Sequence, residues 1–183
     1  MFIHIRSFAA SCAAIACALP ALGCGAAKAT PPGSEPATAG TSALAEAASA
    51  LAGAWRCSGA VYGPDGPSPS EVALEVGLDL DRAWLRTAFV VSSGKYKYSF
   101  NAYRTFDPSV NHWVNVIVDN LGGRALSASA DGVTWTGESS GPMGNMKIRD
   151  TETLVAPGEL RMLGEYSLEA GSWSAGYELS CKR

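Results

Sequence analysis

This sequence of 183 residues has few histidines, few long apolar runs and no surplus of positive charge. Of its two histidines, only His112 lies in the part expected to fold, and it sits in a predicted turn, which argues against a Ser-His-Asp catalytic set. One histidine and two distant cysteines also lack the spacing of metal ligands. The net charge is -3 and no basic stripe exists to neutralise phosphates, which argues against nucleic-acid binding. After the first residues, no stretch is long and apolar enough to cross a membrane as a helix.

Residues 1–23 have the pattern of a signal peptide. A short segment containing Arg6 precedes the uncharged apolar run SFAASCAAIACALPAL, and small residues follow. The run is too short to span a bilayer stably, so it predicts export followed by cleavage. We therefore exclude this segment from the folded domain.

Two processing sites compete after the apolar run. The stretch LGCG resembles a bacterial lipobox with Cys24 as the residue to be lipid-modified, whereas Ala27-Lys28-Ala29 fits ordinary cleavage. Residues 24–40 are rich in Ala, Pro, Gly, Ser and Thr and predict a disordered tether. An anchored protein needs such a tether, so the lipoprotein reading is favoured. It places the protein in the bacterial cell envelope, on the periplasmic face or the outer surface, with free secretion as the alternative.

The cysteines divide by position. Cys12 and Cys17 lie in the signal peptide and Cys24 is the lipidation candidate, which leaves Cys57 and Cys181 in the folded part. Two thiols that remain after export into an oxidising compartment predict a disulfide. Two buried free thiols are the alternative. If the thiols are paired, no cysteine remains as a nucleophile or metal ligand.

The folded part begins with one helical pattern and then changes to strands. Residues 41–53 are dense in alanine and end at a glycine, which predicts a short helix. From there apolar and polar residues alternate, and short Gly-, Asp- and Pro-containing turns separate the runs. The predicted strands are 54–62, 71–80, 83–92, 95–106, 112–119, 124–130, 133–139, 145–155, 159–169 and 172–182.

Short turns make consecutive strands pair antiparallel, and a meander of about ten strands avoids exposed edges by closing. Cys57 belongs to the apolar phase of the first strand and Cys181 to that of the last. A disulfide between them would close an all-β, antiparallel up-and-down β-barrel at its seam. The predicted register has two further pairs: Gly59 opposite Leu179, and Val61 opposite Tyr177.

The stretches LAGAWRCSG, YRTFDPSVNHW and ADGVTWTGE, set in a ten-stranded meander after a short helix, resemble the calycin-type barrels. Within that group, residues 41–183 are most similar to lipocalin-like and nitrobindin-like bacterial proteins. The resemblance implies a barrel that binds a small apolar or amphipathic ligand, or none that is known. Nitrobindin-like members hold haem through a late histidine. This chain has no histidine after His112, and we expect no cofactor.

Aromatic residues on the predicted inner faces are the candidate ligand contacts. They either line a cavity or fill the core, because a barrel of about ten strands encloses more volume than a close-packed small one. They are Trp55, Phe89, Tyr98, Phe100, Trp135 and Tyr177.

Arg104 interrupts the apolar phase of strand 95–106 with a permanent charge. If it points inward it needs an internal carboxylate, a position at the rim, or an anionic amphiphile such as a fatty acid. A β-bulge could instead turn it outward. Strand 112–119 offers Asn115 and Asp119 as possible neighbours, although either that face or its valines could point inward.

Two other functions are weaker. An envelope inhibitor or partner-binding protein would act through exposed loops, for which residues 63–70 and 139–145 are the candidates. An enzyme would need an acid–base pair, and the acidic candidates lie in turns or stand alone, so we predict no catalysis. Those candidates are Asp79, Asp81, Asp119 and Glu138.

Overall fold

The computed structural model describes residues 37–168 and 171–183. The predicted signal peptide, Cys24 and the greater part of the predicted tether lie outside these residues. The described elements, in chain order, are α1 (Ala37–Leu51), β1 (Gly53–Gly63), β2 (Gly66–Asp79), β3 (Trp84–Ser93), β4 (Ser99–Asp107), β5 (His112–Asp119), β6 (Arg124–Ser129), β7 (Thr134–Gly141), β8 (Gly144–Ala156), β9 (Glu159–Ser167) and β10 (Ser174–Lys182).

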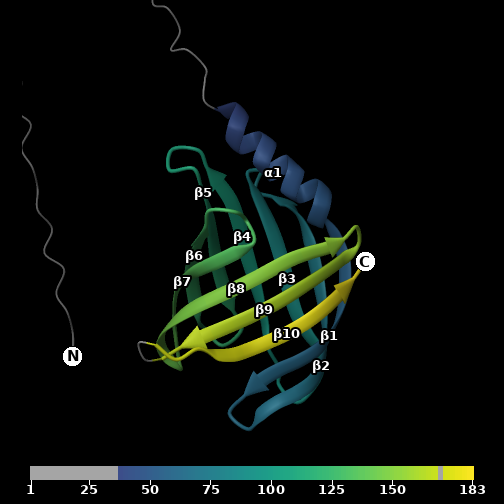
Figure 1. Ribbon diagram of the computed structural model, residues 1–183, viewed down its shortest axis with the longest axis vertical. Coiled ribbons are helices and arrows are strands. Elements are labelled where there is room, and N and C mark those ends of the chain that lie inside the picture. Colours follow the sequence, from purple (N-terminus) through teal and green to yellow (C-terminus); the bar gives the residue numbers. More distant parts are fainter. Residues whose placement is uncertain (1–36, 169–170) are drawn as a thin grey trace, which may run out of the picture. The chain divides into compact units, whose positions relative to one another are not determined.

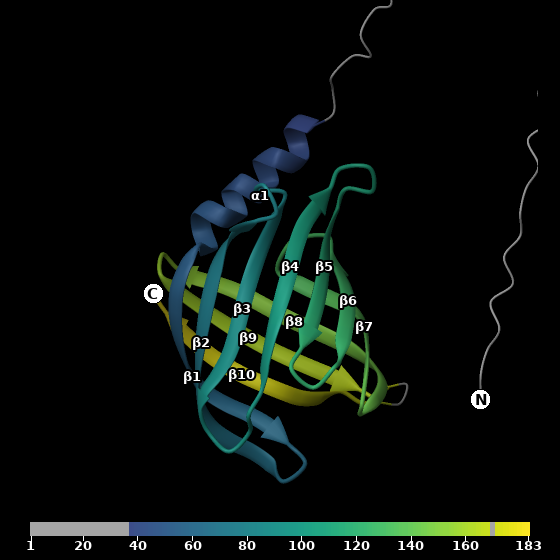
Figure 2. The same cartoon turned by 180° about the vertical axis from the view of Figure 1, so that it is seen from behind.

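The ten strands form a closed antiparallel barrel. Each strand pairs with its neighbours in the chain, and β1 pairs with β10 to complete the ring. Figures 1 and 2 show the blue β1 beside the yellow β10, although they lie at opposite ends of the folded sequence. The predicted all-β up-and-down barrel is confirmed, because short turns and strict alternation leave little freedom in strand order.

The seam between β1 and β10 has the predicted register. Cys57 and Cys181 are bonded to each other across it, with a sequence separation of 124. Both point into the core, where they are almost fully buried. The two further predicted pairs are also present: Gly59 opposite Leu179, and Val61 opposite Tyr177.

Helix α1 lies across one end of the barrel and packs against β2, β3 and β4 (Figures 1 and 2). It begins at Ala37, four residues before the predicted start at Thr41, so it takes in the last residues of the predicted tether. Alanine favours the helical state even outside the apolar face, which accounts for the longer helix. Leu44 and Ala48 are buried against the barrel.

The last residue of the chain fastens α1 to the barrel. The guanidinium of Arg183 donates to the carbonyl of Ala52 at 2.6 Å and lies over the ring of Trp55 at 5.0 Å. The Trp55 indole in turn donates to the carbonyl of Leu51 at 2.8 Å. A cation at a helix C-terminus satisfies free carbonyls and complements the helix dipole. Arg183 is therefore part of the contact between α1 and the barrel.

The barrel interior is apolar on one side and polar on the other. The largest apolar side chains come mainly from β9, β10, β1, β2 and β3. They are Trp55, Cys57, Val72, Leu74, Leu85, Phe89, Leu160, Met162, Leu179 and Cys181. Trp135 on β7 is a large exception on the other side. Strands β4, β5 and β6 instead bury Arg104, Asn115, Ser127 and Ser129. This asymmetry means that close packing of apolar side chains fills only part of the barrel.

The structure corrects the prediction of loops at 63–70 and 139–145. Both segments are tight hairpins, because Gly63 pairs with Gly66 and Gly141 with Gly144 around two-residue turns. Gly66 and Gly144 have φ angles of 92° and 95°, a conformation that glycine adopts readily. The proline and serine residues after the first turn continue into β2 as a strand.

Candidate functional site: a cavity inside the barrel

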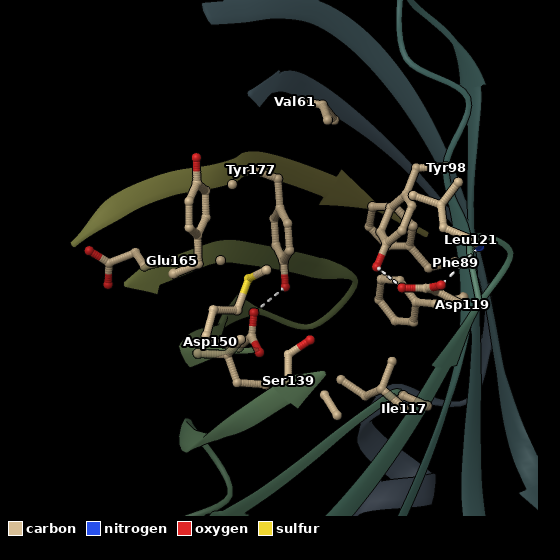
Figure 3. Close-up of a pocket in the computed structure, with 18 of the residues that line it drawn as sticks. Val61, Phe89, Tyr98, Ile117, Asp119, Leu121, Ser139, Asp150, Glu165 and Tyr177 are labelled. Carbon is tan, nitrogen blue, oxygen red and sulfur yellow. Dashed lines mark hydrogen bonds between the residues drawn. The ribbon is translucent and has the colours of Figure 1, made fainter. Parts of the chain in front are cut away.

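A cavity of about 450 Å³ lies inside the barrel and opens at the end away from α1. Its mouth is formed by the connections between β3 and β4, β5 and β6, and β7 and β8, which contribute Lys95, Lys97, Leu121 and Met143. Figure 3 shows side chains from several strands that converge on this space. The deep end of the cavity lies beside Arg104 and Glu152, which also border a second space beneath α1.

Aromatic rings form one wall of the cavity around Phe89. The rings of Phe89 and Phe100 are stacked with centroids 4.5 Å apart, and the ring of Tyr177 lies 5.7 Å from that of Phe89. Tyr98 meets Phe89 edge-on at 6.3 Å. Stacked and edge-on contacts hold aromatic side chains in defined positions, so this wall is largely pre-formed.

An ion pair forms the floor of the cavity. The terminal nitrogens of Arg104 donate to both carboxylate oxygens of Glu152, with Nη1–Oε2 at 2.6 Å and Nη2–Oε1 at 2.5 Å. Both side chains are less than a tenth exposed. The guanidinium also lies over the Trp135 ring at 4.9 Å. Burial alone would lower the pKa of Arg104, but the charge and hydrogen bonds of Glu152, together with the charges of Tyr177 and Asp150, outweigh it and raise that pKa above its usual value.

Three buried polar atoms near this floor have no hydrogen-bond partner among the described residues: Nε of Arg104, Oδ1 of Asn115 and Nε1 of Trp135. The amide nitrogen of Asn115 donates to the hydroxyl of Ser127 at 3.3 Å, and its amide oxygen accepts no hydrogen bond from the described residues. Buried polar atoms are nearly always paired in native proteins. Two donors and one acceptor are therefore left at the floor for water or a bound molecule.

Asp150 lines the cavity and accepts a single side-chain hydrogen bond. Its Oδ1 accepts from the hydroxyl of Tyr177 at 2.7 Å, a contact drawn in Figure 3. Burial raises the pKa of Asp150 to about 6, and the nearby charge of Glu152 adds to this, while Tyr177 and Arg104 oppose it. Burial, reinforced by Asp150, also raises the pKa of the Tyr177 hydroxyl well above its usual value.

Asp119 faces the same cavity but is held by the chain itself. Its Oδ1 accepts from the backbone amides of Leu121 at 2.9 Å and Gly123 at 2.7 Å, which closes the turn between β5 and β6. Its Oδ2 accepts from the Tyr98 hydroxyl at 3.3 Å. Figure 3 shows this pair on the other side of the cavity from Tyr177 and Asp150. Asp119 therefore has a structural role in the turn.

The structure brings together all but one of the predicted ligand contacts. The cavity is lined by Arg104, Tyr98, Phe100, Trp135 and Tyr177. Trp55 does not line it and instead lies in the apolar core beside α1, where Arg183 covers its ring.

Arg104 points inward, as the alternation of its strand predicts. Its partner comes from β8 and not from strand 112–119, whose Asn115 and Asp119 nevertheless face the interior. The valines of β5 take the other face, and Val118 is 47% exposed. Because Glu152 occupies both terminal nitrogens, a role for Arg104 as the anchor of an anionic ligand stays a prediction.

The sequence analysis missed Asp150 and Glu152. On β8 they share the inward phase with Met146 and Ile148, so they interrupt an apolar phase in the same way as Arg104 does on β4. The signal was present as two acidic residues two positions apart. It was ambiguous because the opposite phase of β8 is also polar, and neither face of that strand is plainly the buried one.

Two features of residues 37–168 and 171–183 concern metal ions and membranes. In this part of the chain no three His, Cys, Asp or Glu side chains lie close enough together to hold a metal ion. The same part contains no helix with the length and hydropathy needed to cross a membrane. His112 is exposed at the start of β5, where its Nδ1 lies 2.8 Å from the carbonyl of Val110.

Comparisons of the chain with models of known protein families and with curated proteins find no match. The closed ten-stranded barrel with one helix is consistent with a calycin-like fold. The lipocalin-like or nitrobindin-like membership suggested by the sequence stays a prediction.

Proposed function

We propose that this protein binds a small apolar or amphipathic molecule inside its barrel. The observation that carries the proposal is the cavity of about 450 Å³, open at one end and lined by a pre-formed aromatic wall. Cavities of this size, mostly apolar with a few convergent polar groups, are typical of small-molecule sites. Its interior residues do not fill the barrel to the density of a packed core, in which voids larger than a water molecule are few.

The alternative function, inhibition of a partner through exposed loops, is not favoured. The two segments proposed for it are tight hairpins with two-residue turns. The first is also tied down, since the hydroxyl of Tyr96 donates to the carbonyl of Gly66 at 3.3 Å and Lys95 pairs with Asp65 at 2.6 Å. A hairpin held in this way offers less adaptable surface than a free loop.

The cavity is tested by filling it. Ile117 lines the cavity, whereas its neighbour Val118 points to the outside of the same strand. We expect the neutral fluorescent probe N-phenyl-1-naphthylamine to bind the wild-type protein and Val118→Trp, and to lose at least tenfold in affinity for Ile117→Trp. Equal binding to both variants would place the probe outside the cavity.

A separate experiment identifies the natural ligand. Native mass spectrometry of protein purified from its own host should show a retained small molecule.

We also propose that the protein is an exported lipoprotein, anchored through Cys24 in the cell envelope. The signal-peptide pattern, the lipobox-like LGCG and the tether composition support this. The disulfide supports export, because such bonds persist in oxidising compartments. Metabolic labelling with a palmitate analogue should mark the wild-type chain and not Cys24→Ala. Labelling that survives the substitution would contradict anchoring at Cys24.

A further inference from the structure

In the deep part of the cavity the carboxylates outnumber the cations. Asp150 and Glu152 line this part, and its cation is Arg104, whose two terminal nitrogens are taken by Glu152. Two further carboxylates line the cavity: Asp119 in the turn at the mouth and Glu165, which is paired with Arg149. The other cations that line the cavity are exposed at its mouth: Lys95, Lys97 and Arg124. The deep part of the cavity is therefore negatively charged when its carboxylates are ionised.

Asp150 is a carboxylate that can accept more hydrogen bonds than it does. Asp119 already accepts two backbone amides and the Tyr98 hydroxyl. Asp150 accepts one side-chain hydrogen bond, from the Tyr177 hydroxyl, and its side chain is only partly buried. A carboxylate can accept about four hydrogen bonds, so Asp150 lacks the donors that would stabilise its charge.

A second acceptor in the cavity, on Asn115, also lacks a hydrogen-bond donor. The Oδ1 of Asn115 is buried, accepts nothing from the described residues, and belongs to a side chain that lines the same cavity. The unpartnered donors on Arg104 and Trp135 suit a neutral oxygen, from water or from a ligand hydroxyl. They do not create a free cationic site, because the Arg104 charge is balanced by Glu152.

The aromatic wall can receive the rest of a ligand. Phe89, Phe100 and the ring of Tyr177 present apolar surface beside Asp150 and the cavity mouth. Aromatic faces attract cations as well as apolar groups, and the attraction grows when the cation is withdrawn from water. A body that is apolar and a head that is positively charged would therefore both be stabilised here.

We propose that the cavity takes an amphipathic amine, with its protonated amino group on Asp150 and its apolar or aromatic body against the wall around Phe89. This inference rests on the proposed function, and it names the class of ligand. A protonated amine supplies the donors that Asp150 lacks and compensates its charge. An anionic head would meet Asp150 as a like charge and would have to displace Glu152 from Arg104.

The test is a competition between three ligands with one tail. Decylamine, decanol and decanoate are each titrated against bound N-phenyl-1-naphthylamine on the full chain at pH 7.5. We expect decylamine to displace the probe at a concentration at least tenfold lower than decanol, with decanoate the weakest. In Asp150→Asn, which keeps an oxygen for Tyr177, the advantage of decylamine over decanol should fall at least fivefold. The matched control, Glu138→Gln, removes a carboxylate from the exposed face of β7 and should retain the advantage.

A pH series on the wild-type protein gives a second readout that needs no variant. Asp150 is faced by Tyr177 from β10, Arg104 from β4 and Glu165 from β9, and Glu152 of the floor lies on its own strand β8. Decylamine remains protonated from pH 7.5 to pH 5, so loss of its advantage as pH falls reports protonation of the cavity carboxylate. We expect at least a threefold loss over that range.

The outcomes separate this inference from the function on which it rests. If the neutral probe does not bind the wild-type protein, both the ligand-binding function and the amine preference are wrong. If the probe binds but decylamine has no advantage over decanol, the binding function stands and the amine preference is wrong. If decylamine keeps its advantage in Asp150→Asn and at pH 5, the binding function stands and Asp150 is not the partner of the amino group. Preferential displacement by decanoate would overturn the amine preference in favour of an anionic ligand.

Discussion

Arg104 and Glu152, 48 residues apart in the chain, meet inside the barrel as a two-point ion pair with nitrogen–oxygen distances of 2.6 and 2.5 Å. The pair joins β4 to β8 across the interior and not along the sheet. Two buried charges are costly to withdraw from water, and their mutual hydrogen bonds offset that cost. Each residue therefore destabilises the folded protein once its partner is removed, because its charge is then buried and unpaired.

This relationship predicts how substitutions at the pair combine. We expect Arg104→Met and Glu152→Met each to lower the free energy of unfolding by about 3–5 kcal/mol, because each leaves an unpaired buried charge. The double variant should be closer to the wild type than either single variant. Urea unfolding of all four proteins gives the coupling energy. Additive losses would show that the two charges do not depend on each other.

An exposed ion pair provides the control for that cycle. Lys95 and Asp65 are 2.6 Å apart, but their side chains are 56% and 69% exposed. Exposed pairs contribute at most about 1 kcal/mol. Lys95→Met should therefore change the unfolding free energy far less than Arg104→Met.

The disulfide across the barrel seam should contribute strongly to stability. Cys57 and Cys181 close a loop with a sequence separation of 124. The chain-entropy account assigns about 4–5 kcal/mol to a loop of that length. We expect a reducing agent to lower the unfolding free energy of the wild-type protein by this order. The variant Cys57→Ala/Cys181→Ala should match the reduced protein and should not respond further to the agent. Unfolding that is insensitive to reduction would contradict the prediction.

Asp150 should make the protein less stable as pH rises. Its pKa is raised from 3.8 to about 6 in the folded state, so the folded protein binds more protons than the unfolded chain between about pH 4 and pH 6. Stability from this group is therefore present at low pH and lost as pH rises through 6. At 1.36 kcal/mol per pKa unit, the loss is at most about 3 kcal/mol. The unfolding free energy of Asp150→Asn minus that of the wild type should rise by this order between pH 4 and pH 7.

Asp131 supplies a control of opposite sign. Its carboxylate accepts from the backbone amides of Thr134 and Val133 and from the hydroxyl of Ser129, which together lower its pKa. A lowered pKa stabilises the protein above the unfolded value and loses that effect as pH falls. The advantage of the wild type over Asp131→Asn should therefore shrink toward acid pH. The same trend in both variants would mean that Asp150 is not the group responsible.

Gly164 should be required for the position of Tyr177. The two residues pair across β9 and β10, and a Cβ atom at position 164 would overlap the Tyr177 ring. Gly164→Ala should therefore displace that ring, and with it the Tyr177 hydroxyl that donates to Asp150. Forced repacking of this kind costs about 1–3 kcal/mol. Gly77 on β2 provides the control, because a Cβ atom there would meet no atom within 4 Å. Gly77→Ala should therefore leave the unfolding free energy within about 0.5 kcal/mol of the wild type. Equal effects of the two substitutions would contradict this role.

The barrel and its seam could be predicted from the sequence because they depend on local patterns. A period of two identifies a strand, a glycine in a short turn makes neighbouring strands antiparallel, and the phase of a cysteine says which face it takes. Cys57 and Cys181 then determine the register of β1 against β10, which the structure confirms. Arg104 could be placed inside by the same reasoning, since one residue out of phase is visible in the sequence.

The contents of the barrel were decided only by the tertiary structure. Alternation says that Arg104 and Glu152 point inward, but which inward side chains meet across the interior depends on strand stagger and barrel radius, which no local pattern encodes. Whether Trp55 packs in the core while Tyr177 lines a cavity depends on the volumes of all interior side chains together. For the same reason Asp150 is an ordinary strand residue in the sequence, and it becomes an incompletely satisfied carboxylate only where β8, β10 and the polar side of the barrel surround it.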